Sequence, residues 1–178
     1  SSARKIKTIP GGVSYRNAIA FSKDGSFLAW AKEKEIFLWD RQKEDLTHIL
    51  KGHRRSIKSL CFQRDSRMLF SAGDDFLIHS WEIPSGKAIS SFKETTNSVY
   101  RACFHPTGLF IASTGFMDTS IHIWDVQKRD IEKTFDYDDT ITAIAFDSEG
   151  STMAIALHGG EILFQNFSSG KILYRNKG

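Results

Sequence analysis

Residues 78–83 read IHSWEI, and three further stretches of the chain end a run of apolar residues in a similar way. They are IFLWDR at 36–41, IHIWDV at 121–126 and ILFQNF at 162–167. Trp39, Trp81 and Trp124 are 42 and 43 residues apart, whereas the fourth stretch has Gln165 and Asn166 in place of the pair. A fixed period of this length predicts four copies of one structural unit.

A second phrase recurs upstream of each tryptophan position and has the same period. It reads AFSKDG at 20–25, CFQRDS at 61–66, CFHPTG at 103–108 and AFDSEG at 145–150. The phenylalanines of the four phrases are 41, 42 and 42 residues apart. Because two different phrases recur with the same period, the repeat is not a chance similarity.

Each period has the pattern of short strands separated by turn residues. In the second period the apolar runs are SIKSLCF, RMLFSAG, LIHSWEI and KAISSF, and the breaks are QRDS, DD and PSG. Such runs predict four antiparallel strands joined as a meander. We expect residues 1–178 to form a single all-β unit, with repeats at about 11–51, 52–93, 94–136 and 137–178 and an extra outer-type strand at 3–9.

The period, the four-strand rhythm and the closing Trp-Asp pair together resemble the WD-repeat family of β-propellers, over nearly the whole chain. The resemblance implies four blades, each a four-stranded antiparallel meander. The repeats are diverged, because only Gly52-His53 keeps the family's Gly-His pair and the fourth copy has lost its tryptophan.

The resemblance also assigns a structural hydrogen-bond network. In the second copy it implies that His53 contacts Asp75 in the turn after the second strand, with Ser71 and Trp81 extending the network. In the third copy Ser113, Asp118 and Trp124 match, but Thr95 replaces the histidine. A buried histidine and carboxylate are stable only when both are hydrogen-bonded, which favours a structural role. We call the hydrogen-bonded set of His53, Ser71, Asp75 and Trp81 the brace.

Ser71, His53 and Asp75 also admit a hydrolase interpretation, because a serine nucleophile needs a histidine base and an orienting acid. Ser71 lies inside a predicted strand and lacks the strained turn that such nucleophiles occupy. His79 and His122 share one repeat position, and no Cys or His spacing typical of a metal site is present. We therefore expect no catalytic residue, no metal and no cofactor.

The resemblance implies that partners bind at loop and strand-end positions on one face. Carried over by alignment, these positions are Tyr15, Asn17, Lys32, Ser56, Lys58, Asp74, Ser98, Tyr100, Met117, Thr140, Thr142 and His158. We expect a protein-interaction scaffold or regulatory module within a larger protein or assembly. The alternatives are a nucleic-acid-binding propeller using Arg54, Arg55, Lys58 and Arg101, and a propeller enzyme.

Four blades pose a closure problem, because a self-contained propeller of this family usually has seven or eight. Both sheet faces of a blade are apolar, so an open arc exposes one such face at each end. The chain is part of a larger propeller, forms an eight-blade ring as a homodimer, or closes alone with four blades.

The amino-acid composition limits which kinds of partner we expect. The net charge is only +3 and the basic residues are scattered, which argues against a phosphate-binding surface. No apolar run is long enough to cross a bilayer. The only cysteines, Cys61 and Cys103, form no disulfide framework. We expect protein partners in an intracellular setting, cytoplasmic or nuclear.

Overall fold

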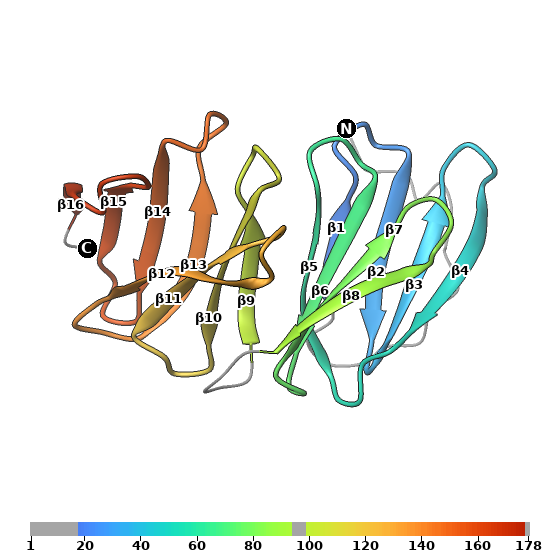
Figure 1. The fold of residues 1–178 in the computed structure, drawn as a ribbon, viewed down its shortest axis with the longest axis horizontal. Helices are drawn as coiled ribbons and strands as arrows, with labels where there is room; N and C mark the ends of the chain where they lie inside the picture. The colour runs from blue at the N-terminus through green and yellow to red at the C-terminus, as the bar shows by residue number, and fades with distance from the viewer. Residues whose placement is uncertain (1–17, 94–98, 177–178) are drawn as a thin grey trace, which may run out of the picture.

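The predicted all-β architecture is confirmed in the computed structural model, which describes residues 18–93 and 99–176 (Figure 1). Sixteen strands form four separate four-stranded antiparallel sheets. Within each sheet the strands lie side by side in chain order. Each sheet is one blade, and no helix occurs in these two ranges. The segment predicted as an extra strand, 3–9, lies outside the described residues.

The strands of blade 2 follow the runs predicted for the second period, and blade 1 has the same strand order. Blade 1 comprises β1 (Ile19–Phe21), β2 (Phe27–Lys32), β3 (Glu35–Asp40) and β4 (Asp45–Lys51). Blade 2 comprises β5 (Ile57–Phe62), β6 (Met68–Gly73), β7 (Leu77–Glu82) and β8 (Ala88–Lys93). In both blades the second and third strands are rich in buried residues, as expected of a sheet that is covered by neighbours.

Blades 3 and 4 repeat this arrangement. Blade 3 comprises β9 (Val99–Phe104), β10 (Phe110–Gly115), β11 (Ser120–Asp125) and β12 (Asp130–Asp136). Blade 4 comprises β13 (Ile141–Phe146), β14 (Thr152–Leu157), β15 (Ile162–Asn166) and β16 (Ile172–Asn176). Blade 4 keeps the same strand order although it lacks the tryptophan of the other three copies.

The turn after the first strand explains the phrase that recurs beside each phenylalanine. Its fourth position has positive φ in every blade, with values of 71° at Gly25, 62° at Ser66, 75° at Gly108 and 76° at Gly150. Glycine adopts this left-handed conformation without a Cβ clash. Three of the four repeats therefore carry glycine there, and the serine of blade 2 is the exception.

Apolar side chains hold neighbouring blades together in three clusters. Between blades 1 and 2, small residues such as Ala29 and Ala31 pack with Leu69 and Trp81. Phe70 and Ile111 belong to the cluster between blades 2 and 3. The third cluster, between blades 3 and 4, includes Ile121, Ile123, Met153 and Ile155. The fold is thus a series of sheet-on-sheet interfaces.

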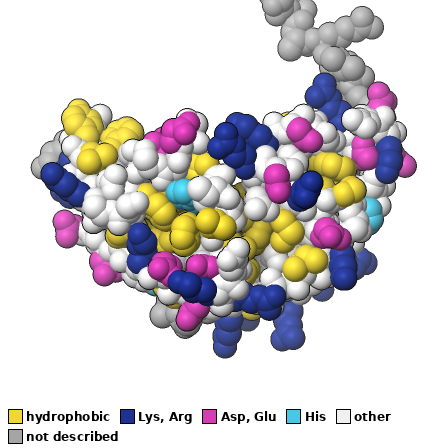
Figure 2. Space-filling model, turned by 45° about the horizontal axis from the view of Figure 1, so that its top comes forward, with side chains coloured by type: hydrophobic (Ala, Val, Ile, Leu, Met, Phe, Trp, Pro, Cys, Tyr) yellow, Lys and Arg dark blue, Asp and Glu magenta, His cyan; other side chains and the backbone are white. Residues whose placement is uncertain are grey.

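The first strands of successive blades contact one another along the inside of the arc, in the order β1, β5, β9 and β13. Ser59 of β5 fixes one such contact, because its Oγ donates to the carbonyl of Ala102 and accepts from the Ala102 amide. The resulting arc has a half-disc outline in space-filling view (Figure 2). Blades 1 and 4 form its two ends (Figure 1).

Candidate functional site

The network of blade 2 has a defined hydrogen-bond direction. The indole Nε1 of Trp81 donates to Ser71 Oγ at 2.9 Å. The Ser71 hydroxyl then donates to His53 Nε2, 2.8 Å away, because a carboxylate faces the other ring nitrogen. His53 Nδ1 donates to Asp75, with 2.9 Å to each carboxylate oxygen. Trp81, Ser71, His53 and Asp75 thus form one continuous chain of hydrogen bonds.

Asp75 is the end of this chain and gathers backbone donors as well. Its carboxylate accepts from the amides of Arg54, at 2.8 Å, and Leu77, at 3.3 Å. Burial favours a higher pKa for Asp75, but the hydrogen bonds from His53 and Arg54 outweigh it, so the pKa of this carboxyl is lowered. The charged carboxylate therefore ties the loop before β5 to the turn between β6 and β7.

Gly52 lets the loop approach the network closely. A Cβ added at this position would lie 2.9 Å from Cη2 of the Trp81 indole, closer than side-chain atoms normally pack. Position 52 is therefore a glycine because any larger side chain would clash with the Trp81 indole.

The buried position of Ser71 argues against a nucleophilic role. Only 1% of the residue is exposed, and its hydroxyl is engaged by both Trp81 and His53. A catalytic serine must present its oxygen to a substrate and to an oxyanion site. Ser71, His53 and Asp75 have the residue types of a catalytic triad. Their buried, hydrogen-bonded arrangement is that of a structural network.

The cysteines are also unsuited to nucleophilic chemistry. Burial raises the pKa of the Cys61 thiol to about 12. Burial, with a contribution from Cys61, also raises the pKa of Cys103. Both side chains stay protonated near neutral pH, and the thiolate is the reactive form.

The other blades keep parts of the network. In blade 3, Trp124 Nε1 donates to Ser113 Oγ at 2.8 Å, and Asp118 Oδ1 accepts from the Ser120 amide at 3.1 Å. Thr95, at the histidine position, lies outside the described residues.

Blade 4 has a substitute pair that the sequence interpretation missed. The Tyr137 phenol donates to Gln165 Oε1, which is 28 positions further on, the spacing that separates His53 from Trp81. Asp139 accepts from the Gly159 and Thr140 amides. These backbone hydrogen bonds lower the pKa of Asp139, with that of Gly159 contributing most. The sequence signal for this pair is that Tyr137, a hydrogen-bond donor, and Gln165, an acceptor, occupy the positions aligned with His53 and Trp81.

His79 lies beside the brace without taking part in it. Its ring centroid is 4.4 Å from that of His53, and its Nε2 is buried without a hydrogen-bond partner. His53, Asp75 and His79 bring potential metal-ligand atoms within 4.8 Å of one another. Because both ring nitrogens of His53 are already hydrogen-bonded, this grouping offers a metal no free lone pair from His53.

His79 makes stability depend on pH. Burial chiefly, and then the nearby His53, lower its pKa from 6.5 to about 4. The unfolded chain therefore binds more protons between these values, so stability is full above pH 6.5 and falls as the pH drops toward 4. We expect a loss of about 1–2 kcal/mol across this window after allowance for solvent screening.

Urea unfolding at pH 7 and at pH 4.5 measures this dependence, with His79→Gln as the matched variant. The variant should lose less stability than the wild type over the same interval. Equal losses in the two proteins would show that His79 is not the titrating group.

A pocket on the edge between blades 3 and 4 brings together five of the predicted partner-binding residues. It has a volume of about 360 Å³ and is lined by Tyr100, Phe116, Met117, Thr140, Ile141, Thr142 and His158. Phe116 was not predicted, although it precedes Met117. The ring of Tyr100 meets that of Phe116 edge-on, with 5.4 Å between centroids. Phe116 and Met117 are 51% and 71% exposed, so two large apolar side chains face solvent here.

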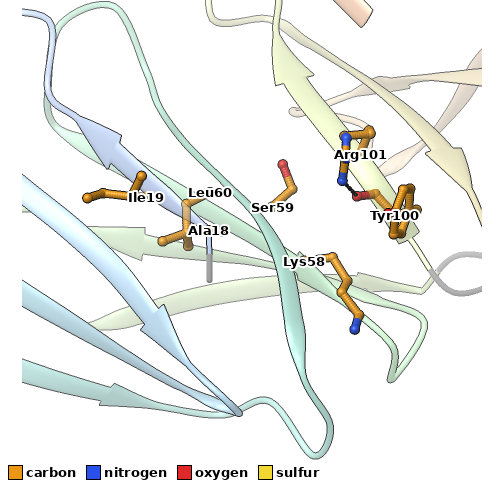
Figure 3. A pocket seen from close by; sticks show the side chains of 7 residues that line it. All are labelled: Ala18, Ile19, Lys58, Ser59, Leu60, Tyr100 and Arg101. Carbon is orange, nitrogen blue, oxygen red and sulfur yellow. Dashed lines mark hydrogen bonds between the residues drawn. The ribbon is translucent and has the colours of Figure 1, made fainter. Parts of the chain in front are cut away.

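A second cavity, drawn in Figure 3, has the lining residue Tyr100 in common with the first. It occupies about 530 Å³ and is lined by Ala18, Ile19, Lys58, Ser59, Leu60, Tyr100 and Arg101. The Arg101 guanidinium lies 4.2 Å from the Tyr100 ring centroid and donates to the Tyr100 carbonyl at 3.0 Å. The positive charge of Arg101 therefore lies over the ring of Tyr100, the residue that lines both cavities.

The remaining predicted partner-binding residues are more dispersed. Lys58 and Asp74 form an ion pair of 2.9 Å. Ser56 is exposed and Lys32 half-buried. Tyr15, Asn17 and Ser98 lie outside the described residues. Apart from Lys58, which lines the second cavity with Tyr100, the described positions that converge on a pocket are those of blades 3 and 4.

The chain is similar to several proteins of known family. A family model described as "WD domain, G-beta repeat" matches residues 44–82 and 86–125. "Eukaryotic translation initiation factor 3 subunit I" of Aspergillus fumigatus is 26% identical over 105 residues, covering 59% of this chain and 31% of that protein. "Pre-mRNA-processing factor 19" of Bos taurus is 25% identical over 170 residues, covering 70% of this chain and 34% of that protein.

A solved structure shares the fold. The crystal structure of the β-propeller domain of Cps50 (Swd1) from Myceliophteria thermophila matches with a TM-score of 0.84 and 23% identity. The match covers 97% of this chain and 58% of that one. The chain spans about a third of the length of the curated relatives. Repeat phrases, blade geometry and these similarities agree: two stretches of the chain match the WD-repeat family model, and its fold is that of a β-propeller.

Proposed function

We propose that this chain is a non-catalytic protein-interaction scaffold whose partner docks on the pocket between blades 3 and 4. The observation that carries the proposal is the convergence of Tyr100, Phe116, Met117 and His158 on one exposed, mostly apolar pocket. Exposed aromatic and methionine side chains around a cavity are typical anchors of protein interfaces.

The relatives support a role within an assembly. One is named as a subunit of a translation initiation factor and another as a pre-mRNA-processing factor. Such names favour an intracellular setting and protein partners for this chain. Among the described residues no helix is long and apolar enough to cross a membrane. A second copy of the chain is a further partner that the proposal includes.

Substitution at the pocket tests the docking surface. We expect Phe116→Asp to weaken binding of a protein partner at least tenfold, because a buried charge would replace an aromatic anchor. The matched control is Ile89→Glu, since Ile89 is 44% exposed and does not line this pocket. Proteins retained from a cell extract by the wild type and by Ile89→Glu, but lost with Phe116→Asp, should then be titrated individually against the purified chains. Equal affinities for the wild type and Phe116→Asp would contradict the proposal.

Nucleic-acid binding is the second candidate, and the position of Arg101 favours it. Its guanidinium reaches the second cavity and makes no ion pair with a described carboxylate. Lys58 is already neutralised by Asp74, which weakens the basic cluster. Binding of a single-stranded oligonucleotide that falls steeply with added salt would favour this candidate.

A further inference from the structure

The turn between β10 and β11 carries two apolar side chains that the fold does not require. Phe116 and Met117 begin this turn and are 51% and 71% exposed. The equivalent turns of blades 1 and 2 begin with charged residues, Glu33 and Asp74. Met117 also has a φ of 55°, a left-handed conformation that glycine or asparagine adopts more readily. Neither burial nor backbone conformation accounts for the apolar pair, and such a pair beside a cavity is typical of a binding surface.

Backbone hydrogen bonds hold the walls of the pocket between blades 3 and 4 in place. The Ile141 amide of blade 4 donates to the Asp118 carbonyl of blade 3, at 2.9 Å. The His158 amide donates to the Thr140 carbonyl at 2.8 Å. The pocket is therefore part of the folded scaffold, so a partner does not have to order it on binding.

Arg101 places a positive charge next to this pocket. Its guanidinium lies over the ring of Tyr100, donates to the Tyr100 carbonyl and has no ion pair with a carboxylate of the described residues (Figure 3). Lys58, by contrast, points away from Arg101 and is paired with Asp74 at 2.9 Å (Figure 3). A guanidinium has five N–H donors in a planar fork that matches a carboxylate. Arg101 therefore retains donors for an acidic group of a partner.

The carboxylates that flank the pocket in sequence bind backbone amides. Asp118 accepts from the amide of Ser120 in its own turn, at 3.1 Å. Asp139 accepts from the amides of Gly159 and Thr140, at 2.6 and 2.7 Å. These hydrogen bonds hold both carboxylates in the turns of blades 3 and 4, and neither is bonded to the guanidinium.

Tyr100 connects the apolar part of the surface with the charged part. Its ring centroid is 5.4 Å from that of Phe116 and 4.2 Å from Cζ of Arg101, so the Phe116 ring and the guanidinium are at most about 10 Å apart. An extended peptide advances about 3.3 Å per residue. Two side chains of one peptide therefore reach both groups when they are up to about three positions apart.

We propose that the segment docking on this pocket is an extended peptide with a large apolar side chain and, within about three positions of it, an aspartate or glutamate. This inference rests on the proposed docking function and adds the chemistry of the partner. The apolar side chain fills the cavity against Phe116, Met117 and Ile141, and the carboxylate accepts two parallel hydrogen bonds from Arg101. A nucleic acid fits this surface less well, because its phosphates need clustered cations and Lys58 is already paired.

Selection of a phage-displayed library of random dodecapeptides on the 178-residue chain tests the proposal. The enriched peptides should share a large apolar residue with an aspartate or glutamate within three positions of it. Selection on Arg101→Glu should instead enrich lysine or arginine at the acidic position, because the charge of the surface is reversed. Arg67→Gln is the matched control, since Arg67 is exposed and lines neither cavity, and it should enrich the same peptides as the wild type.

Titration of one enriched peptide by fluorescence anisotropy isolates the ion pair. Replacing its acidic residue with the matching amide should weaken binding to the wild type about tenfold. Arg101→Gln should bind the acidic peptide and its amide form equally, at the weaker level, because the pair is then absent from both. Circular dichroism establishes that Arg101→Gln, Arg101→Glu and Phe116→Asp are folded.

The outcomes separate this inference from the docking function on which it rests. Peptides that are lost with Phe116→Asp but carry no acidic residue, or that bind the wild type and Arg101→Gln equally, would overturn the inference and leave the docking function standing. A selection that enriches no peptide dependent on Phe116 would overturn both. Binding of oligothymidylate that is lost with Arg101→Glu and kept with Phe116→Asp would assign Arg101 to a nucleic acid and overturn the inference as well.

Discussion

Replacing Trp81 with alanine is expected to lower the free energy of unfolding by about 3–5 kcal/mol. The side chain is only 2% exposed and lies in the cluster between blades 1 and 2. Its removal leaves a cavity against Ala29 and Leu38 and withdraws the donor that orients Ser71. A loss of this size is a large fraction of the stability of an ordinary domain.

Trp81→Phe separates the two contributions of the indole. It keeps most of the packing but removes the Nε1 donor, so a loss of about 1–2 kcal/mol is expected. Denaturant unfolding at a fixed protein concentration measures both variants. A loss below about 1 kcal/mol for Trp81→Ala would show that the blade interface does not depend on this residue.

Replacing Asp75 with alanine is expected to lower the free energy of unfolding by about 2–4 kcal/mol. Three donors then lose their acceptor: His53 Nδ1 and the amides of Arg54 and Leu77. Because the pKa of Asp75 is lowered by folding, its contribution is present above the ordinary carboxyl pKa of 3.8 and fades as the pH falls below it.

Asp118→Ala in blade 3 is the matched control for Asp75. The Asp118 carboxylate accepts from the Ser120 amide in the equivalent turn. A loss of about 1 kcal/mol is expected there. Equal losses of unfolding free energy for Asp75→Ala and Asp118→Ala in urea would show that the hydrogen bond from His53 adds no stability to blade 2.

The strands could be predicted from repeated local spacing, whereas the network of His53, Ser71, Asp75 and Trp81 was implied by the family resemblance. Trp81 and Trp124 set the register of the third strands, and Asp75 precedes Trp81 by six positions as Asp118 precedes Trp124. A strand of alternating side chains allows only one register that buries the apolar set. Register alone does not give the contacts of His53, which lies in the loop before β5.

The pocket and the blade 4 pair were harder to predict, because the aligned repeat positions give where these residues lie but not which side chains contact one another. Phe116 reaches the pocket only because blade 4 supplies Ile141 and His158 on the facing wall. Tyr137 and Gln165 replace a histidine and a tryptophan by different donor and acceptor groups. Position in the repeat gave their location, but their pairing depends on side-chain length and direction in three dimensions.

The contact between His53 and Asp75 carries the central claim that this polar set is a structural brace. A double-mutant cycle with His53→Ala, Asp75→Ala and the double variant, followed by urea unfolding at pH 7, isolates the energy of that contact. We expect a coupling energy of at least about 1.5 kcal/mol, because each single variant leaves a buried polar partner unsatisfied. A coupling energy near zero would contradict the account.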